Sequence, residues 1–391
     1  KMELKKKLDE LNDLLNHKLY SSTAGLANGG KKGLSYESWL SSHQPFHWLA
    51  EYYQIMHGNN GFDVIIGNPP YVVYNAKKYF YKISENYKTY KCANLYAYCI
   101  ERGHQILSNK GTFGIIVPNS SISATKMSPV QDIIKNGNIC WVSNYSWRPA
   151  KLFEGADMLL AIIIDRKDEK EYTYSTRYYK WYNEYRAFLF QNLAYNNSNL
   201  SKLEGSIAKI PSLQFINALE KINKTDGGHL LGKNFLISPS IYILYYFRAV
   251  QYWFKVLDCI PIYKDNGIDC ITGEMKPIYA KDEQEKYVII AFLSSSTFFT
   301  NYIMWSSCQV VNSRDFQIAF DINNIDSKNL QKLAKLGKDL EKDYQLHSHI
   351  KERTYSKKGR LFTMEKQHFF IKESKPIIDE IDKLLAKHYG F

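Results

Sequence analysis

The segment Asn68-Pro69-Pro70-Tyr71 combines residue types that can hold an amine on an aromatic ring in position for reaction. Such an amine is planar and weakly nucleophilic, because its lone pair is delocalised into the ring. Two acceptors directed at its two hydrogens would make the nitrogen more pyramidal and richer in electrons. The Asn68 side-chain oxygen and the Pro69 carbonyl can be these acceptors. Because proline fixes φ, the carbonyl is held rigidly, and rigid acceptors give electrostatic preorganisation.

Tyr71 adds an aromatic face on which a nucleic-acid base could stack. A base inside a duplex must first leave the helix, which costs a few kcal/mol, and stacking at about 1–3 kcal/mol per base offsets much of that cost. We therefore interpret the segment as a site that holds the N6 amine of adenine for direct methyl transfer. The alternative is a proline-rich turn that performs no chemistry.

The elements around this segment favour the catalytic interpretation. Apolar runs predict strands at 62–66, 111–117, 139–145 and 158–164, and helical spacing predicts helices at 96–107 and 130–135. Alternating strands and helices predict an α/β fold with a largely parallel sheet. Ligands bind such sheets at the carboxyl ends of the strands, and Asn68 follows a predicted strand directly.

Composition gives the broad class of the protein. A net charge of +12 and a pI of about 9.1 fit a polyanionic partner, and they fit a basic protein without such a partner equally well. The six cysteines include no C-x-x-C pair, so we expect neither a metal site nor a disulfide scaffold. The first residues lack the apolar region of a signal peptide, and no apolar run approaches 18 residues. The sequence thus predicts a cytoplasmic protein without a membrane partner.

The stretch from Gly61 to Asn75 resembles the N6-adenine DNA methyltransferases, and most of all the large single-chain type IIG-like restriction–modification enzymes. The approach through 44–48, the segment 94–96 and the strand leading to 118–120 are similar to that family as well. The resemblance implies S-adenosylmethionine as methyl donor. It also implies that Asn68, Pro69, Pro70 and Tyr71 form the catalytic motif and that Asn68 contacts the cofactor.

Leu152-Phe153-Glu154 is similar to the family segment whose aromatic ring packs on the other face of the flipped base. By this resemblance, Phe153 and Tyr71 would sandwich the target base. Phe153 could equally be a core residue, since an aromatic side chain before a buried strand commonly packs inside the protein.

After about residue 170 the strand–helix alternation is lost, which predicts a second, mixed α+β domain. The run 289–305 followed by 310–315 resembles the target-recognition domains of the same enzymes, and the tail 374–382 resembles their carboxyl-terminal region. The implied division is a helical lead-in (1–60), a catalytic domain (61–170), a target-recognition domain (171–360) and a carboxyl-terminal helical segment (361–391). The implied partner is double-stranded DNA.

The sequence departs from the family before Asn68. The family carries a Gly-rich cofactor loop after the first strand of its Rossmann-like sheet, and that loop should precede Asn68. Here the preceding residues indicate helices, and the Gly-rich stretch 25–33 follows a helix instead of a strand. We expect the chain to be a carboxyl-terminal portion of a longer methyltransferase. Alone it should bind S-adenosylmethionine poorly and be inactive.

Basic residues suggest where DNA would be contacted. Lysines interleaved with tyrosines follow the catalytic motif, and a second basic cluster lies near residue 355. A solvated surface explains the second cluster about as well as phosphate contact does. Arg314 could read bases or pair with an acidic side chain. The predicted DNA-binding residues are Lys77, Lys78, Arg314, Lys357, Lys358 and Arg360.

Two other functions are compatible with parts of this pattern. The chain could be a DNA-binding specificity module whose chemistry is supplied elsewhere. It could also methylate a glutamine side-chain amide in a protein, because Asn-Pro-Pro-Tyr motifs serve that reaction too. Those glutamine-modifying enzymes are compact, so the 221 residues after 170 argue against the second alternative.

Overall fold

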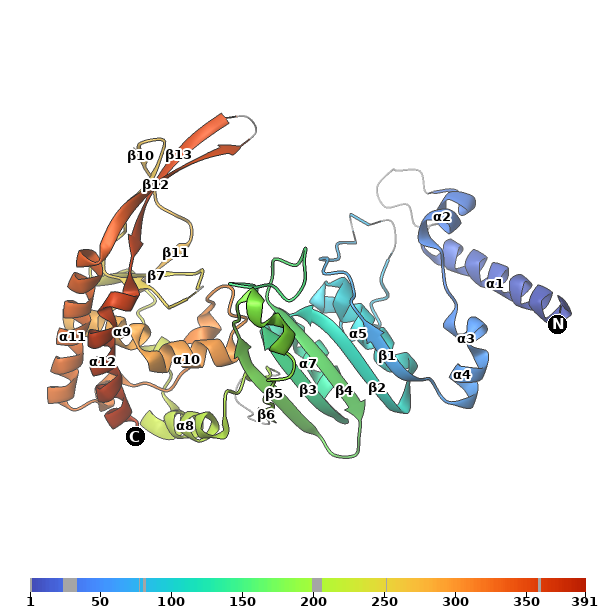
Figure 1. The fold of residues 1–391 in the computed structure, drawn as a ribbon, viewed down its shortest axis with the longest axis horizontal. Coiled ribbons are helices and arrows are strands. Elements are labelled where there is room, and N and C mark those ends of the chain that lie inside the picture. The colour runs from blue at the N-terminus through green and yellow to red at the C-terminus, as the bar shows by residue number, and fades with distance from the viewer. Residues whose placement is uncertain are drawn as a thin grey trace. The chain divides into compact units, whose positions relative to one another are not determined.

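In the computed structural model the fold is mixed α/β with several sheets (Figure 1). It divides into two compact units, Lys1–Pro211 and Ser212–Phe391, each with its own core. The structure describes residues 2–23, 34–76, 78–79, 82–198, 206–250, 252–357 and 360–391.

The first unit begins with helices and continues into a six-stranded sheet in the order β1-β2-β4-β3-β5-β6. The helices before the sheet are α1 (Met2–Thr23), α2 (Tyr36–His43), α3 (Trp48–Glu51) and α4 (Tyr53–Gly58). The strands are β1 (Phe62–Gly67), β2 (Leu107–Pro118), β3 (Asn138–Tyr145), β4 (Leu160–Lys167), β5 (Tyr172–Tyr179) and β6 (Asn196–Asn197). The helices among the strands are α5 (Leu95–Ile106), α6 (Ser120–Ser123) and α7 (Ser128–Lys135).

The sheet is mixed, so the expectation of a largely parallel sheet was wrong. The pairs β1–β2 and β3–β5 are parallel, whereas β4 pairs antiparallel with both β2 and β3. The reason is the connection from β3 to β4, which contains no helix. Two consecutive strands can pair in parallel only if a crossover connection, usually a helix, joins them, whereas strands joined by a loop pair antiparallel.

One face of this sheet is covered by α5 and α7 (Figure 1). Apolar side chains of both helices, such as Ile100 and Val130, pack with Ile115, Val142 and Ile163 of the strands. These strand residues alternate with less buried ones because side chains along a strand point to opposite faces. This buried layer holds the strands in the register that forms the edge where Asn68 lies.

The other face of the sheet is less covered, and most clearly so at β1. This strand lies at the edge of the sheet and pairs with β2 alone among the described strands. Val64 is 58% exposed and Ile66 is 82% exposed, although both are apolar strand residues. Parallel strands are normally buried on both faces, so β1 has the apolar character of an interior strand although the described residues give it one neighbour.

The boundary between the units lies after Pro211 instead of near residue 170. The difference arises because β5 continues the first sheet through its parallel pairing with β3, for example Trp141 opposite Tyr174. The tyrosine-rich sequence of β5 does not show an apolar run, so its place in the sheet was not apparent from periodicity.

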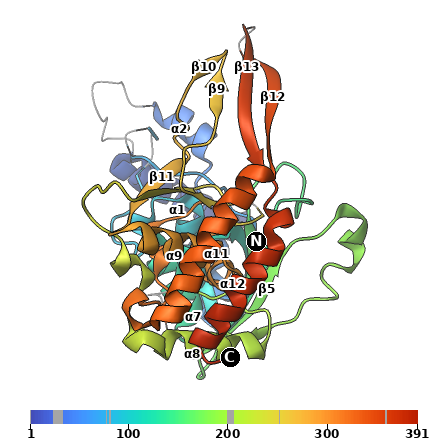
Figure 2. The same cartoon turned by 90° about the vertical axis from the view of Figure 1, so that its left-hand side faces the viewer.

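The second unit packs helices against two small sheets in the orders β10-β9-β13-β12 and β11-β7-β8. Its helices are α8 (Leu213–Lys224), α9 (Glu283–Ser294), α10 (Ser296–Trp305), α11 (Ser327–Leu346) and α12 (Lys375–His388). Its strands are β7 (Ile243–Phe247), β8 (Val256–Leu257), β9 (Tyr263–Asp265), β10 (Ile268–Asp269), β11 (Met275–Tyr279), β12 (Ser348–Lys357) and β13 (Arg360–Phe369). Figure 2 shows β12 and β13 extending beyond α11 and α12 as a two-stranded ribbon, with β9 and β10 beside it.

The core of the second unit forms around α9, whose residues from Tyr287 to Ser294 are all buried. Its amino terminus is fixed by Asp282, which accepts a hydrogen bond from the Glu285 amide at 2.8 Å. Helix α11 approaches α9 closely at Gly337, where a Cβ atom would lie 2.0 Å from the Tyr287 carbonyl oxygen. Helix α12 packs on the same core through Ile381 and neighbouring residues, so residues 361–391 do not form a separate segment.

Among the described residues, no single helix has the length and hydropathy to span a membrane. Only the consecutive helices α9 and α10, taken together, have that length and hydropathy, and their axes are bent by 58° relative to one another.

Candidate functional site

The predicted catalytic motif lies at the carboxyl end of β1, where Gly67 is aligned with Ile115 of β2. Asn68 follows β1 directly and is exposed, whereas Tyr71 is half-buried. The Tyr71 hydroxyl lies 2.9 Å from Asn68 Oδ1 and 3.0 Å from the Ile116 carbonyl oxygen. The hydroxyl group thus connects the motif to the neighbouring strand.

This connection fixes the orientation of the Asn68 amide. The tyrosine hydroxyl has one proton and donates it to one acceptor at a time. Burial raises the pKa of Tyr71 to about 12, so the hydroxyl keeps its proton at neutral pH. When Asn68 Oδ1 accepts it, the second lone pair of this oxygen is still available to an amine outside the protein. Asn68 Oδ1 is therefore already oriented before a ligand binds, which is what a preorganised hydrogen-bond acceptor requires.

Tyr71 and Phe153 both pack against the same apolar cluster, which includes Tyr145, Leu160 and Trp181. The Tyr71 ring also meets Tyr96 edge to face, with 6.5 Å between the ring centroids. Phe153 is half-buried, so its role as a core residue and its role as a wall for a base are both compatible with its position. The sandwich of a base between Tyr71 and Phe153 stays a prediction.

The sheet topology explains how Phe153 comes to this edge. Strands β1, β2 and β3 run in the same direction, so their carboxyl ends meet at one edge of the sheet. Phe153 lies in the loop that leaves β3 at Tyr145 and enters β4 at Leu160, next to Pro118 of β2. Residues separated by some 85 positions in the sequence are therefore brought to one end of the sheet.

A buried polar network at the same edge was not predicted. Asn119 follows β2 and donates from Nδ2 to Asn144 Oδ1 at 3.0 Å, and Asn144 donates to Ser175 Oγ at 3.1 Å. Asn119 Oδ1 is buried and accepts no hydrogen bond from a described residue. A buried acceptor without a partner is costly, so it marks a place where a water or ligand donor would be favourable. The available signal was Asn144 near the end of the predicted strand 139–145.

The described residues do not contain the expected cofactor loop. Before β1 they form the helices α1 to α4, and no described strand precedes Phe62. A Gly-rich loop of the Rossmann type needs such a strand. The Gly-rich stretch 25–33 lies outside the described residues. The described residues therefore fit a site that would hold an amine, and they do not fit a site that would hold S-adenosylmethionine.

The predicted DNA contacts fall in three places. Lys78 is exposed in the segment after the motif, and Arg314 is half-buried in a one-turn helix (Ser313–Phe316). Asn312 caps that turn, since its side chain accepts from the Asp315 amide. Lys357 and Arg360 are opposite one another where β12 and β13 meet. Lys77 and Lys358 lie outside the described residues.

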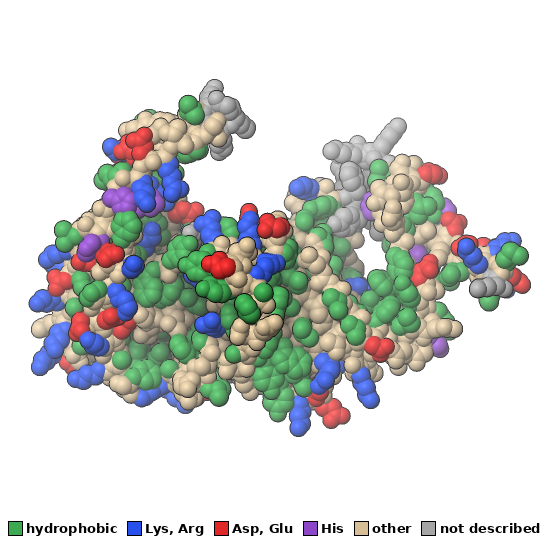
Figure 3. All heavy atoms as spheres, viewed as in Figure 1, with side chains coloured by type: hydrophobic (Ala, Val, Ile, Leu, Met, Phe, Trp, Pro, Cys, Tyr) green, Lys and Arg blue, Asp and Glu red, His purple; other side chains and the backbone are tan. Residues whose placement is uncertain are grey.

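The ribbon formed by β12 and β13 separates its charges between two faces. Directly opposite residues share a face, as do residues two apart along a strand. By register, one face carries the pairs Lys351/Lys366, Arg353/Met364 and Tyr355/Phe362. The other face carries both glutamates of the ribbon as the pair Glu352/Glu365. We call the first set the basic face of the ribbon; Figure 3 shows blue and purple side chains gathered at the base of the ribbon.

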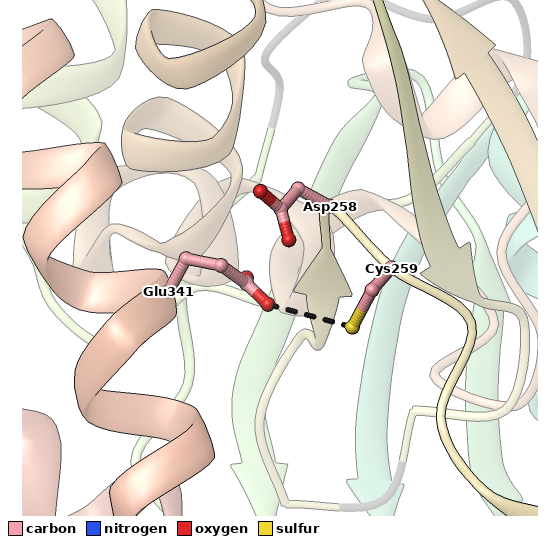
Figure 4. Close-up of side chains that lie close together, drawn as sticks. All are labelled: Asp258, Cys259 and Glu341. Atoms are coloured by element: carbon pink, nitrogen blue, oxygen red, sulfur yellow. Dashed lines mark hydrogen bonds between the residues drawn. The ribbon is translucent and has the colours of Figure 1, made fainter.

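A cluster in the second unit could hold a cation by its composition. Asp258 and Cys259 follow β8, Glu341 lies on α11, and their ligand atoms are all within 4.8 Å of one another (Figure 4). Lys286 Nζ lies 3.5 Å from Asp258 Oδ2, and Gln345 donates to Glu341 Oε1 at 3.1 Å. The positive charge that Asp258 needs is thus already supplied by a lysine.

Glu341 is 5% exposed, and burial together with the nearby Asp258 raises the pKa of its carboxyl to about 7. Burial also raises the pKa of the Cys259 thiol to about 11. Both groups therefore keep their protons up to neutral pH. Because the Asp258 carboxyl is already paired with Lys286, and Glu341 and Cys259 hold their protons, we assign no metal to the cluster.

The chain is similar to known restriction–modification proteins in sequence. Residues 2–153 match the family of Eco57I restriction-modification methylases. A protein of Methanocaldococcus jannaschii, named as a type II restriction enzyme and methyltransferase, is 27% identical over 177 residues. That alignment covers 42% of this chain and 14% of the relative. The resemblance seen in the sequence is thereby confirmed.

Solved restriction–modification enzymes are similar to the chain at low identity. The Type IIL enzyme MmeI in complex with DNA matches 84% of this chain and 54% of its own, with 11% identity and a TM-score of 0.43. A nuclease-deletion mutant of the Type ISP enzyme LlaGI, in complex with a DNA substrate mimic, matches 83% of this chain and 48% of its own, with 10% identity and a TM-score of 0.41. The chain thus spans about half the length of these enzymes.

The Glu341 carboxyl predicts a pH-dependent stability. Its folded pKa of about 7 exceeds its unfolded value, so its contribution is fully present below pH 4.5 and is lost as the pH rises toward 7. Glu341→Gln should flatten this part of the profile, by at most about 3 kcal/mol in the free energy of unfolding. The measurement is urea denaturation between pH 4.5 and 7.5.

The matched control is Glu352→Gln, which changes an exposed glutamate on β12. This variant should keep the pH dependence of the unaltered protein. An unchanged profile in Glu341→Gln would contradict the assignment of a proton to Glu341.

Proposed function

We propose that the chain is the base-holding and DNA-reading portion of a restriction–modification enzyme that methylates the N6 amine of adenine at a specific duplex site. S-adenosylmethionine is the proposed methyl donor, because it supplies an electrophilic methyl group to enzymes of the matched family. The observation that carries the proposal is the Asn68 amide at the carboxyl end of β1, held by the Tyr71 hydroxyl at 2.9 Å. The family match over residues 2–153 supports it.

In this proposal the chain holds the amine. Asn68 Oδ1 and the Pro69 carbonyl accept its two hydrogens, which favours an electron-rich nitrogen. Because the adjacent prolines fix φ, the acceptors need not reorganise when the base arrives. The base leaves the duplex and lies between Tyr71 and Phe153, whose rings supply stacking energy.

We further propose that the cofactor-binding half of the catalytic domain adds to the open edge of β1 with a parallel strand. The exposed apolar side chains of Val64 and Ile66 support this occupant, because a second neighbour and a covering layer would bury them. The 14% coverage of the curated relative is compatible with a larger parent enzyme. Without that half, the 391-residue chain is expected to be inactive.

A second candidate, a DNA-binding module without chemistry of its own, is favoured by the basic face of the ribbon. Lys351 and Lys366 are directly opposite one another, and like charges in this position repel. A polyanion on this face would relieve the repulsion. A two-stranded ribbon also fits the major groove of DNA. The two candidates are compatible if the ribbon reads DNA while the motif holds the base.

The catalytic proposal is tested by Asn68→Ala in the complete natural protein that carries this chain. Loss of one preorganised hydrogen-bonding group should lower kcat for methyl transfer to duplex DNA by about 100-fold or more. The assay is incorporation of labelled methyl groups from S-adenosylmethionine. Asn86→Ala, which changes an exposed asparagine, is the control and should retain activity.

Tyr71→Phe refines the same experiment, because it keeps the ring and removes the hydroxyl that holds Asn68. We expect about a tenfold loss in kcat, the equivalent of one neutral hydrogen bond, with little change in KM for DNA. Full activity of the Asn68→Ala variant would contradict the catalytic proposal.

The DNA-reading proposal is tested on the 391-residue chain with Lys351→Gln. Removing one phosphate contact should weaken binding to duplex DNA. It should also make the slope of log affinity against log salt concentration shallower by about 0.9. Lys328→Gln makes the same change in charge at an exposed position on α11 and should leave the slope unaltered. Equal slopes for both variants would contradict a role of the ribbon in binding.

A further inference from the structure

We propose that the second unit contains a nucleotide-binding pocket in which Lys255 receives a phosphate group and neighbouring aromatic rings receive the base. The inference goes beyond the proposed methylation, because every residue that lines the pocket lies between Phe247 and Ile378. It therefore depends neither on Asn68 nor on methyl transfer.

The pocket is a cavity of about 760 Å³ beside the base of the ribbon. Residues after β7, the end of β13 and the first turn of α12 form its walls. A volume in the range of roughly 300–1,000 Å³ is typical of sites for small organic ligands. The side chains that the argument uses are basic (Lys255, Lys366, Lys372, Lys375) and aromatic (Trp253, Phe370).

Lys255 is the residue that points to an anion. It precedes β8 and makes no ion pair or hydrogen bond with its ammonium group among the described residues. Its Nζ lies 4.4 Å from the centroid of the Phe247 ring, which satisfies the charge only in part. Burial and the nearby Lys366 lower the pKa of Lys255 to about 8. A half-buried ammonium without a carboxylate partner among the described residues is costly, and a bound anion would offset that cost.

The charged groups that line the pocket with Lys255 make it positive. Lys366 and His368 come from β13, Lys372 from the turn after it and Lys375 from α12. Burial, with Lys351 and Lys366 next in effect, lowers the pKa of His368. Lys375 is paired with Asp379, and Glu274, before β11, is the acidic lining residue. More positive than negative charge remains, which favours a phosphate over a neutral ligand.

The aromatic lining determines the rest of the ligand. The Trp253 indole donates to the Ser294 carbonyl oxygen at 3.1 Å and packs on Phe299 at 4.5 Å between centroids. Its ring is thus held in place before any ligand binds. Phe370 is 47% exposed and stacks on His349 at 4.7 Å. Fixed aromatic faces beside a phosphate site are suited to a nucleoside phosphate, whose base stacks while its phosphate meets the lysines.

Two sources could supply this chemistry. Lys366 belongs both to the pocket and to the basic face of the ribbon, so a nucleotide of a bound DNA strand could enter the pocket. A free mononucleotide has the same phosphate and base. The shared ligand class is a nucleoside monophosphate, and the experiment separates the sources.

The experiment is calorimetric titration of the 391-residue chain with deoxyadenosine monophosphate, deoxyadenosine and inorganic phosphate. The monophosphate should bind more tightly than either part alone. Lys255→Met, which keeps an apolar stem without the charge, should weaken its binding at least tenfold. Lys332→Met, an exposed change on α11, is the control and should bind as the unaltered chain does.

Protonation gives a second readout. A bound phosphate raises the pKa of Lys255 above about 8, so binding at pH 8 should take up protons. Affinity should fall as the pH rises from 7 to 9, because Lys255 loses its charge. Titrations in two buffers of different ionisation enthalpy measure this uptake, which Lys255→Met should abolish. If that variant does not fold, Lys366→Gln must show the weakened binding instead.

The source is identified by comparing duplex DNA that contains one unpaired nucleotide with the fully paired duplex. If the duplex with the unpaired nucleotide binds more tightly, and Lys255→Met removes this difference, the pocket takes a nucleotide of DNA. If the two duplexes bind equally, the pocket takes a free nucleotide. The proposal is overturned if the monophosphate does not bind, or if it binds the Lys255→Met variant with unchanged affinity. Because no methyl transfer is measured, either result is independent of the proposed catalytic function.

Discussion

The parallel pairing of β1 with β2 is the constraint on which the candidate active site depends. It places the end of β1 beside Ile116, so that the Tyr71 hydroxyl lies near both the neighbouring strand and Asn68 Oδ1. A slip of one residue in this register would turn Tyr71 away from the Ile116 carbonyl. The buried layer of α5 and α7 fixes the register, and the orientation of the Asn68 amide follows from it.

The edge strand β1 also indicates which part of the site is not found among the described residues. An interior parallel strand has two neighbours and two covered faces, whereas β1 has one described neighbour and exposes Ile66 to 82%. The site is preorganised on the side that would hold the base, since Tyr71, Phe153 and the Asn119 network all come to this edge. In the proposed arrangement, further polypeptide beside β1 would supply the side that holds a methyl donor.

The sequence predicted the elements that have local signals. Apolar runs identified β1 to β4 within a few residues, and Asn-Pro-Pro-Tyr directly follows β1 as expected. The sequence could not predict the antiparallel β4, the inclusion of β5 in the first sheet or the contact of Tyr71 with Ile116. Each of these depends on which distant segments pair, and periodicity carries no information about partners. Lys255 likewise has no local signal, because its unusual character arises from burial and from Lys366, over a hundred residues away.

The central claim is that Asn68 and Pro69 hold an exocyclic adenine amine. It is tested most directly by nucleoside analysis of duplex DNA that has been methylated by the complete natural protein. After digestion to nucleosides, mass spectrometry with authentic standards identifies the modified base. The account predicts N6-methyldeoxyadenosine. Methylation found at C5 of cytosine, where no amine reacts, would contradict it.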